Sequence, residues 1–200
     1  MSEQTIFDKA IELFDSANRE DPNKVTVDGK EWPKELLYSH RMSEMLQRFK
    51  PEADDEMKLA IHAQHIQRWK SPRTDYPMNR QGYLQWRVHL YQFHADTAGE
   101  LMQQAGYSEE SIARTKKAVS KKGIKVNADS QLLEDIADLV FLEYYMEDFV
   151  ARHPEYDEEK WLEIIRKTWR KMSGAAQEFA LAGNITLPEH LVPLIQKAVA

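Results

Sequence analysis

The chain has 200 residues, 42% of them hydrophobic, and a net charge of −6 at pH 7. This length is typical of one domain with a single core, and the absence of cysteine excludes disulfides, zinc–thiolate sites and thiol nucleophiles. The polar first ten residues do not resemble a signal peptide, and no apolar run approaches the ~18 residues that cross a membrane. We therefore expect one domain over residues 1–200, located in the cytoplasm and without membrane contact.

Apolar residues recur at helical spacing along almost the whole chain. The spacing predicts a helix from about residue 6 to the break at 21, one from 33 to 49, and one from after Pro51 to about 71. Two more are predicted from 83 to 105, with Gly106 as the terminating glycine, and from 108 to 122. A further helix should begin at a cap on Asp129 or Ser130, another should run from 157 to 172, and two short ones should close the chain, the last from about 188. The segment nearest to a strand is KVTVDGK, which begins at Lys24. The expected fold is an all-α bundle of about eight or nine helices.

The segment HAQHIQRWKSPRTDYPMNRQGYLQWR, residues 62–87, is basic and aromatic within an acidic chain. A local basic patch of this kind favours a confined anion, because guanidinium groups match phosphate oxygens with two parallel donors. The predicted substrate-binding residues are Arg68, Arg73, Tyr76, Arg80, Arg87, Lys121 and Lys122. The alternatives are that the arginines pair with acids elsewhere, that the aromatics are core residues, and that the lysines complement a helix dipole.

Histidines and acids at inward-facing positions suggest a metal site. His62 and His65 are one helical turn apart, His94 follows a buried stripe, and Asp135 follows Glu134 at the start of an apolar run. Buried imidazoles and a buried carboxylate on different helices suit a divalent ion such as manganese, iron, zinc or magnesium. We expect His65, His94 and Asp135 to be the ligands. A buried His–Asp hydrogen bond without an ion is the alternative.

Four segments together resemble the HD-type metal-dependent phosphohydrolases. They are LLYSHRMSEML, LAIHAQHIQRW, FHADTAGELMQQAGY and LLEDIADLVFLE, and they span about residues 36–143. The resemblance implies an HD-like helical core and hydrolysis of a phosphorylated compound. The chain departs from that pattern at two ligand positions, because Tyr38 stands where the first histidine belongs and Ile66 where the aspartate belongs. His40, two residues on, should face away from Tyr38.

The departures leave two readings open, a modified metal site and a site that has lost its ion. Three protein ligands are enough to hold a catalytic ion with open positions for water. In the first reading His62 and Glu134 replace missing groups, and we expect Gln64, His62 and Glu134 to take part in catalysis. In the second reading the fold is a binding module for a phosphorylated small molecule.

Almost the whole chain is also similar to the domain of unknown function 4202 family. The phrases QHIQRWKSPRTDYPMNRQGYLQWR, LEDIADLVFLEYY and RKTWRKMS carry this resemblance, which implies no activity. A third functional reading is nucleic-acid or protein binding through the basic segments. The acidic balance of the chain argues against broad nucleic-acid affinity, which needs many phosphate contacts at once. The expected partner is therefore a small phosphorylated ligand, and the oligomeric state is left open.

Overall fold

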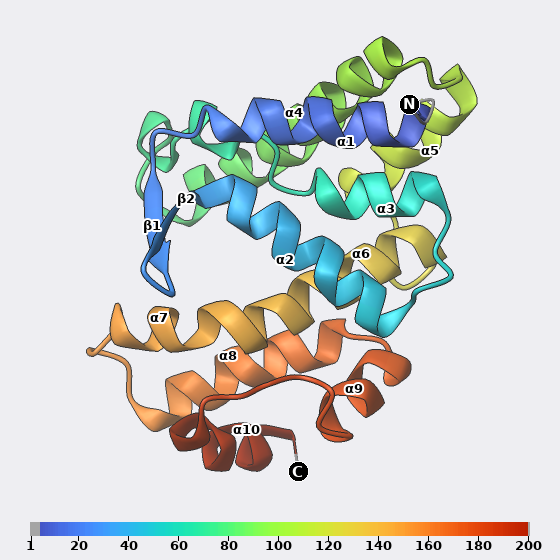
Figure 1. The fold of residues 1–200 in the computed structure, drawn as a ribbon. Coiled ribbons are helices and arrows are strands. Elements are labelled where there is room, and N and C mark those ends of the chain that lie inside the picture. Colours follow the sequence, from blue (N-terminus) through green and yellow to red (C-terminus); the bar gives the residue numbers. More distant parts are fainter. Residues whose placement is uncertain (1–4, 200) are drawn as a thin grey trace. The chain divides into compact units, whose positions relative to one another are not determined.

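The computed structural model describes residues 5–199 and is all-α (Figure 1). In this range it contains ten α-helices and one two-stranded sheet, which confirms the predicted multi-helix bundle with slightly more helices than expected. Residues 1–4 and 200, which the single-domain prediction included, lie outside the described residues. The chain forms two compact units, Met1–Leu133 and Glu134–Ala200, and each is described by itself.

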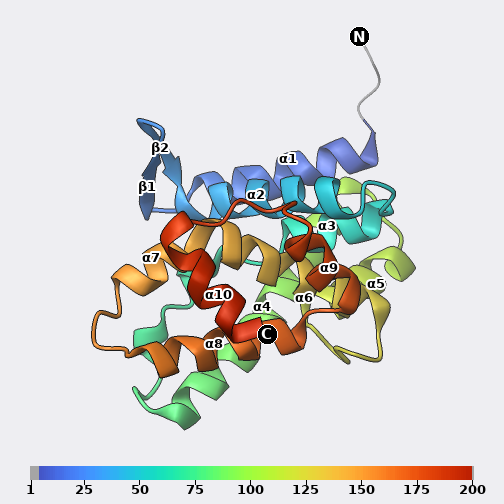
Figure 2. The same cartoon turned by 90° about the horizontal axis from the view of Figure 1, so that it is seen from below.

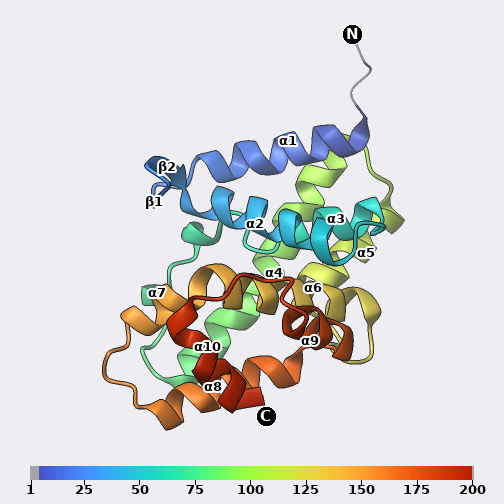
Figure 3. The same ribbon diagram turned by 60° about the horizontal axis from the view of Figure 1, so that its bottom comes forward.

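The first unit carries most of the helices. Its elements are α1 (Ile6–Arg19), β1 (Lys24–Val27), β2 (Lys30–Pro33), α2 (Lys34–Phe49), α3 (Asp55–His62), the short 3-10 helices η1 (Arg68–Lys70) and η2 (Arg73–Asp75), α4 (Arg80–Ala105) and α5 (Glu109–Val119). The helix α6 (Ala128–Val140) begins in this unit. Within it, α1 contacts α2, α3 and α4, and α3 also contacts α2 and α5 (Figure 3).

The second unit continues α6 through a π-helical turn into a smaller group of helices. Its elements are η3 (Phe141–Tyr145), α7 (Met146–Ala151), α8 (Glu158–Lys171), α9 (Gly174–Leu181), η4 (Glu189–Leu191) and α10 (Val192–Val199). The helices α8 and α10 pack against each other (Figure 2). In the described part of the chain, no helix combines the length and the apolar character needed to cross a membrane.

Side-chain caps explain where most of these helices begin. The Thr5 hydroxyl accepts from the Asp8 backbone N–H and the Asp8 carboxylate accepts from the Thr5 backbone N–H, a reciprocal capping box that starts α1. Single caps follow the same logic, since a side-chain oxygen satisfies an N–H that the helix leaves free. They are Asp54 for α3, Asn79 for α4, Ser108 for α5, Asp157 for α8 and Ser173 for α9.

Several elements begin or end at residues other than those predicted, and local hydrogen bonds and backbone angles explain the differences. The KVTVDGK segment forms a hairpin of β1 and β2, because Asp28 and Gly29 take φ values of 51° and 74° and make a tight two-residue turn. The helix predicted from 83 begins at Arg80, capped by Asn79. The side chain of Asn127 accepts from the Ser130 N–H, so neither predicted residue caps α6. Gly106 ends α4 as expected, with φ 108°.

The predicted third helix is shorter than expected, because it ends at His62 and not near residue 71. After His62 the backbone hydrogen bonds tighten to a spacing of three residues, as in the bond from the Ile66 N–H to the Ala63 carbonyl. Gln67 then takes a left-handed conformation with φ 50°, and its N–H donates to the buried side chain of Asn18 on α1. This contact fixes the turn that carries His65 against α1.

The core of the first unit surrounds this turn. One cluster of fully or almost fully buried residues joins α1, α3 and its following turn, and α4: Ala10, Phe14, Leu59, Ala63, Ile66, Ala98, Met102 and Ala105. Ile66 is among them with no exposed surface. At the position where the HD resemblance expects an aspartate, the chain therefore places a core side chain.

We predict that Gly82→Ala destabilises the first unit. A Cβ atom at Gly82 would lie 2.1 Å from the Pro77 carbonyl oxygen, so the loop before α4 must shift. Overpacking of this kind costs about 1–3 kcal/mol, measured by urea unfolding. The matched control is Gly174→Ala at the first residue of α9, where the added carbon meets no other described residue within 4 Å apart from its chain neighbours and the backbone of its own helix. Equal stability of the Gly82 variant and the wild type would contradict the observed loop geometry.

Candidate functional site

Two polar clusters lie in the first unit, on α1, α2, α3, the turn after α3, and α4. The His65 cluster consists of Glu35, Tyr38, Gln64, His65, Arg68 and His94. The Asp15 triad consists of Asp15, His40 and His62. Tyr38 belongs to the first and His40 to the second, which agrees with the expectation that these two neighbours on α2 face different ways.

His65 is held by three partners in the first cluster. The ring of Tyr38 stacks on it with centroids 4.1 Å apart, and Arg68 places a guanidinium nitrogen 2.6 Å from its Nε2 atom. A Glu35 carboxylate oxygen lies 3.5 Å from Nδ1. Because a guanidinium can only donate, Nε2 must accept, so the ring proton is on Nδ1 and the imidazole is neutral.

His94 has one satisfied ring nitrogen and one that is not. Its Nδ1 lies 2.8 Å from the carbonyl oxygen of Ile66, which can only accept, so Nδ1 carries the proton. Its Nε2 is buried and has no hydrogen-bond partner among residues 5–199. The ring lies 5.9 Å from that of His65. A buried acceptor of this kind is costly unless a ligand or an ion completes it.

Burial keeps both imidazoles uncharged. Burial lowers the pKa of His94 to about 3, helped by the nearby His65. Burial also lowers the pKa of His65 well below its usual value, and the charges of Arg68 and Lys121 act in the same direction. Burial raises the pKa of Glu35. The Glu35–His65 contact is therefore no ordinary salt bridge, because each environment opposes the charge that such a bridge needs.

Gln64 and Tyr38 complete the cluster. The Tyr38 hydroxyl donates to the side-chain oxygen of Gln64, which is buried. This bond leaves the amide nitrogen of Gln64 available as a donor at the same place. Gln64, predicted to be catalytic, thus belongs to the same cluster as His65 and Arg68.

The cationic residues predicted to bind substrate make different contacts in the structure. Arg73 donates to the backbone carbonyls of Tyr76, Pro77 and Asn79, so it fastens the loop before α4. Arg87 donates to the hydroxyls of Tyr83 and Tyr91. The charges of Arg87 and Lys121 reach His65, where both lower its pKa.

The remaining predicted substrate contacts lie in other surroundings. Tyr76 packs near His89 with ring centroids 6.0 Å apart, and Arg80 is the exposed first residue of α4. Lys122 lines a hollow of about 740 Å³ beside α4 and α5. Of the predicted cations, the structure therefore brings Arg68 into direct contact with His65, and Arg87 and Lys121 within electrostatic reach.

Glu134 and Asp135 belong to the second unit and have partners there. The Asp135 carboxylate accepts from the backbone N–H and the hydroxyl of Ser173, at the start of α9. Lys171 donates to Glu134 and to Asp138. These contacts account for buried acids at the start of an apolar run. The predicted roles of Glu134 in catalysis and of Asp135 as a metal ligand stay predictions.

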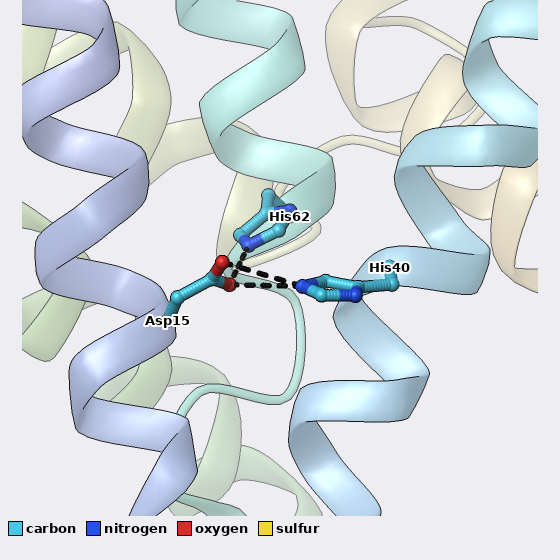
Figure 4. Close-up of side chains that lie close together, drawn as sticks. All are labelled: Asp15, His40 and His62. Atoms are coloured by element: carbon cyan, nitrogen blue, oxygen red, sulfur yellow. Dashed lines mark hydrogen bonds and ion pairs between the residues drawn. The ribbon is translucent and has the colours of Figure 1, made fainter. Parts of the chain in front are cut away.

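The Asp15 triad brings together side chains from α1, α2 and α3 (Figure 4). The Nε2 atom of His62 lies 2.8 Å from one Asp15 oxygen, and that of His40 lies 3.3 Å from both oxygens. Burial acts to raise the pKa of Asp15, but the hydrogen bonds and charges of His40 and His62 outweigh it, so this pKa lies well below its usual value. His62, predicted to assist catalysis, therefore faces the triad.

The sequence did not lead us to predict Asp15 and His40 as site residues, although the pattern of α1 indicated that Asp15 needs a partner. Asp15 follows Phe7 and Ile11 at four-residue intervals, so it lies on the apolar face of an amphipathic helix. A carboxylate at such a position needs a partner. The partner itself was not predictable from spacing, because His40 and His62 come from two other helices.

The fold and the two sites together define an all-α protein with two histidine-centred polar clusters on neighbouring helices. The chain belongs to the family described as domain of unknown function (DUF4202), whose model matches residues 8–195. No curated protein and no solved structure matches the chain.

We predict that the pH dependence of stability reports on His94. Its folded pKa, about 3, is below the unfolded value of 6.5, so its contribution is complete above pH 6.5 and is lost as the pH falls towards 3. For one imidazole this loss is about 1.4 kcal/mol per pH unit. With a chelator present, His94→Gln should lose stability less steeply between pH 6.5 and 5 than the wild type, measured by urea unfolding.

The control for this measurement is Gly174→Ala, which changes no titratable group. It should keep the wild-type slope. If His94→Gln also kept that slope, the neutral buried imidazole inferred at this position would be wrong.

Proposed function

We propose that the chain is a divergent HD-like metal-dependent hydrolase that acts on a small phosphorylated or nucleotide-like substrate. The observation that carries the proposal is the buried Nε2 of His94, which has no hydrogen-bond partner in the described part of the chain and lies beside the neutral ring of His65. Metal-binding histidines usually donate their other ring N–H to a carbonyl or carboxylate, as His94 does to Ile66. Its free nitrogen therefore has the properties of a metal ligand.

His65 and His94 would hold the ion. A divalent ion bound there would supply a water of lowered pKa as the nucleophile. Gln64, held by Tyr38, has an amide nitrogen that can orient a water or a substrate oxygen. Glu35 lies against His65 Nδ1 and fixes the direction of that ring, as a carboxylate beside a ligating histidine commonly does.

Arg68 links the phosphate to the ion in this proposal. In the structure its guanidinium contacts the Nε2 atom of His65, which an ion would also need. A phosphate is the stronger partner for a guanidinium, because both are charged and two parallel hydrogen bonds form. A bound phosphate can therefore draw Arg68 away and leave His65 Nε2 to the ion. The ion and the phosphorylated ligand should then increase each other's affinity.

The positive charges near His65 support an anionic substrate. Lys34, Arg68, Arg87 and Lys121 all act on its pKa through their charges. Among these, Arg68 lies nearest and the others contribute from farther away. A cluster of cations around buried neutral imidazoles raises the local concentration of anions and stabilises negative charge that develops on a transferred phosphoryl group.

A second candidate is a binding module for a phosphorylated small molecule, without an ion. The observation that favours it is the loss of two HD ligand positions, since Tyr38 stacks on His65 and Ile66 is part of the core. In this case Arg68 and the other cations bind the phosphate, and His94 Nε2 accepts a hydrogen bond from the ligand.

We predict phosphate release from a panel of nucleotides and sugar phosphates in the presence of Mn²⁺, and its loss in His94→Gln. Arg68→Gln should lower kcat by roughly 10²–10³-fold, as expected when one preorganised donor to the reacting group is removed. The matched control is Arg152→Gln, which alters an exposed arginine on the second unit and should keep the wild-type rate. Circular dichroism verifies that each variant is folded.

The same panel separates the two candidates. A ligand that raises the melting temperature through Arg68, with no turnover under any ion tested, would support the binding module and overturn the hydrolase. If no phosphorylated compound produced turnover or a thermal shift, both candidates would be wrong.

A further inference from the structure

The Asp15 triad brings three possible metal ligands close together. One ligand atom from each of Asp15, His40 and His62 lies within 4.8 Å of the other two. Bond lengths of about 2.0–2.2 Å place neighbouring ligand atoms of a tetrahedral or octahedral ion roughly 3.0–3.5 Å apart. The two nitrogen–oxygen pairs of the triad, at 2.8 and 3.3 Å, are close to this spacing.

Both imidazoles point at the same carboxylate with the same ring atom (Figure 4). One neutral histidine–carboxylate hydrogen bond would satisfy His62, and the second histidine is not needed for that purpose. Three protein ligands from three helices, two nitrogen and one oxygen, are the set that binds a transition-metal ion while leaving other positions open.

The surroundings of His62 hold its ring in one orientation. The ring stacks on Phe14, with centroids 6.3 Å apart, and its Nδ1 lies 2.8 Å from the Ser43 hydroxyl. A hydroxyl both donates and accepts, so Ser43 can serve either tautomer of the ring. When Nε2 binds an ion, Nδ1–H donates to Ser43, which is the arrangement that metal-binding histidines commonly show.

The exposed fraction of the side chain increases across the triad, from His62 to Asp15 to His40. The side chains of His62, Asp15 and His40 are 4%, 15% and 41% exposed. Two ligands are therefore held in place by packing, while the third borders solvent beside the edge of Trp32, with centroids 5.9 Å apart. An ion has a path to the triad on this side, and water can fill its remaining positions.

We infer that Asp15, His40 and His62 form a binding site for a divalent transition-metal ion such as Zn²⁺ or Fe²⁺, separate from the His65 cluster. Two imidazoles and one carboxylate disfavour Mg²⁺ and Ca²⁺, which prefer oxygen ligands. The site shares no residue with the His65 cluster and has its own ligand from α1. It therefore does not depend on the proposed hydrolase.

The test is a titration of the chelator-stripped protein with Zn²⁺ by calorimetry, and with Co²⁺ by visible absorption. We expect one ion per chain at the triad, with loss of this binding in Asp15→Asn and in His40→Gln. Ser43→Ala should weaken it by roughly 10–100-fold, the usual effect of removing a hydrogen-bond partner of a ligand. Ca²⁺ should not compete.

Two controls keep the outcome specific to the triad. His153→Gln and His94→Gln should retain triad binding, and a second zinc equivalent that only His94→Gln removes would belong to the His65 cluster. Because His40 is partly exposed, His40→Gln should fold, which a melting curve in chelator verifies. As a second measurement, the His40 and His62 ring resonances of the wild type should shift on adding Zn²⁺.

The inference is overturned if the wild type binds neither Zn²⁺ nor Co²⁺ at millimolar concentration, or if Asp15→Asn and His40→Gln bind them as the wild type does. Absence of nucleotide turnover in the same preparations would count against the hydrolase and leave the triad site standing.

Discussion

The end of α3 at His62 is the constraint on which the rest of the candidate chemistry depends. Had the helix continued, His62 and His65 would share one face, since residues three apart are helical neighbours. The tightened backbone and the left-handed Gln67 give the two histidines different partners. His62 meets Asp15 and Ser43, whereas His65 meets Tyr38, Glu35 and Arg68. One short segment thus supplies an imidazole to each of two clusters.

The same turn places a core side chain where the resemblance to the HD enzymes predicted an aspartate. Ile66 follows His65 and lies in the core formed by α1, the α3 turn and α4. A carboxylate there would be buried among apolar side chains, at high cost without an ion. The Ile66 backbone keeps a polar role, because its carbonyl oxygen holds the proton of His94 Nδ1 in place. The packing of the Ile66 side chain and the hydrogen bond to its backbone carbonyl therefore act together to position the His94 ring.

The two clusters differ in electrostatics. Cations surround the His65 cluster and burial keeps its imidazoles neutral, which suits an anionic ligand. The Asp15 triad holds a carboxylate of lowered pKa between two imidazoles, which suits a cation. Arg68 adds to this difference, because its guanidinium contacts the Nε2 atom of His65, which an ion would need as a ligand. In the proposed hydrolase, a bound phosphate would therefore have to draw Arg68 away before an ion could reach this nitrogen.

The sequence by itself determined the all-α fold, most helix starts, the end of α4 at Gly106 and the opposed directions of Tyr38 and His40. These follow from local rules, namely side-chain caps, glycine conformation and helical spacing. Only the tertiary structure decided that α3 ends at His62, that Asp15 meets His40 and His62, and that Arg73 fastens its own loop. The reason is that those contacts join residues far apart in the chain, for example Asn18 with Gln67, and spacing along one helix carries no information about a partner on another.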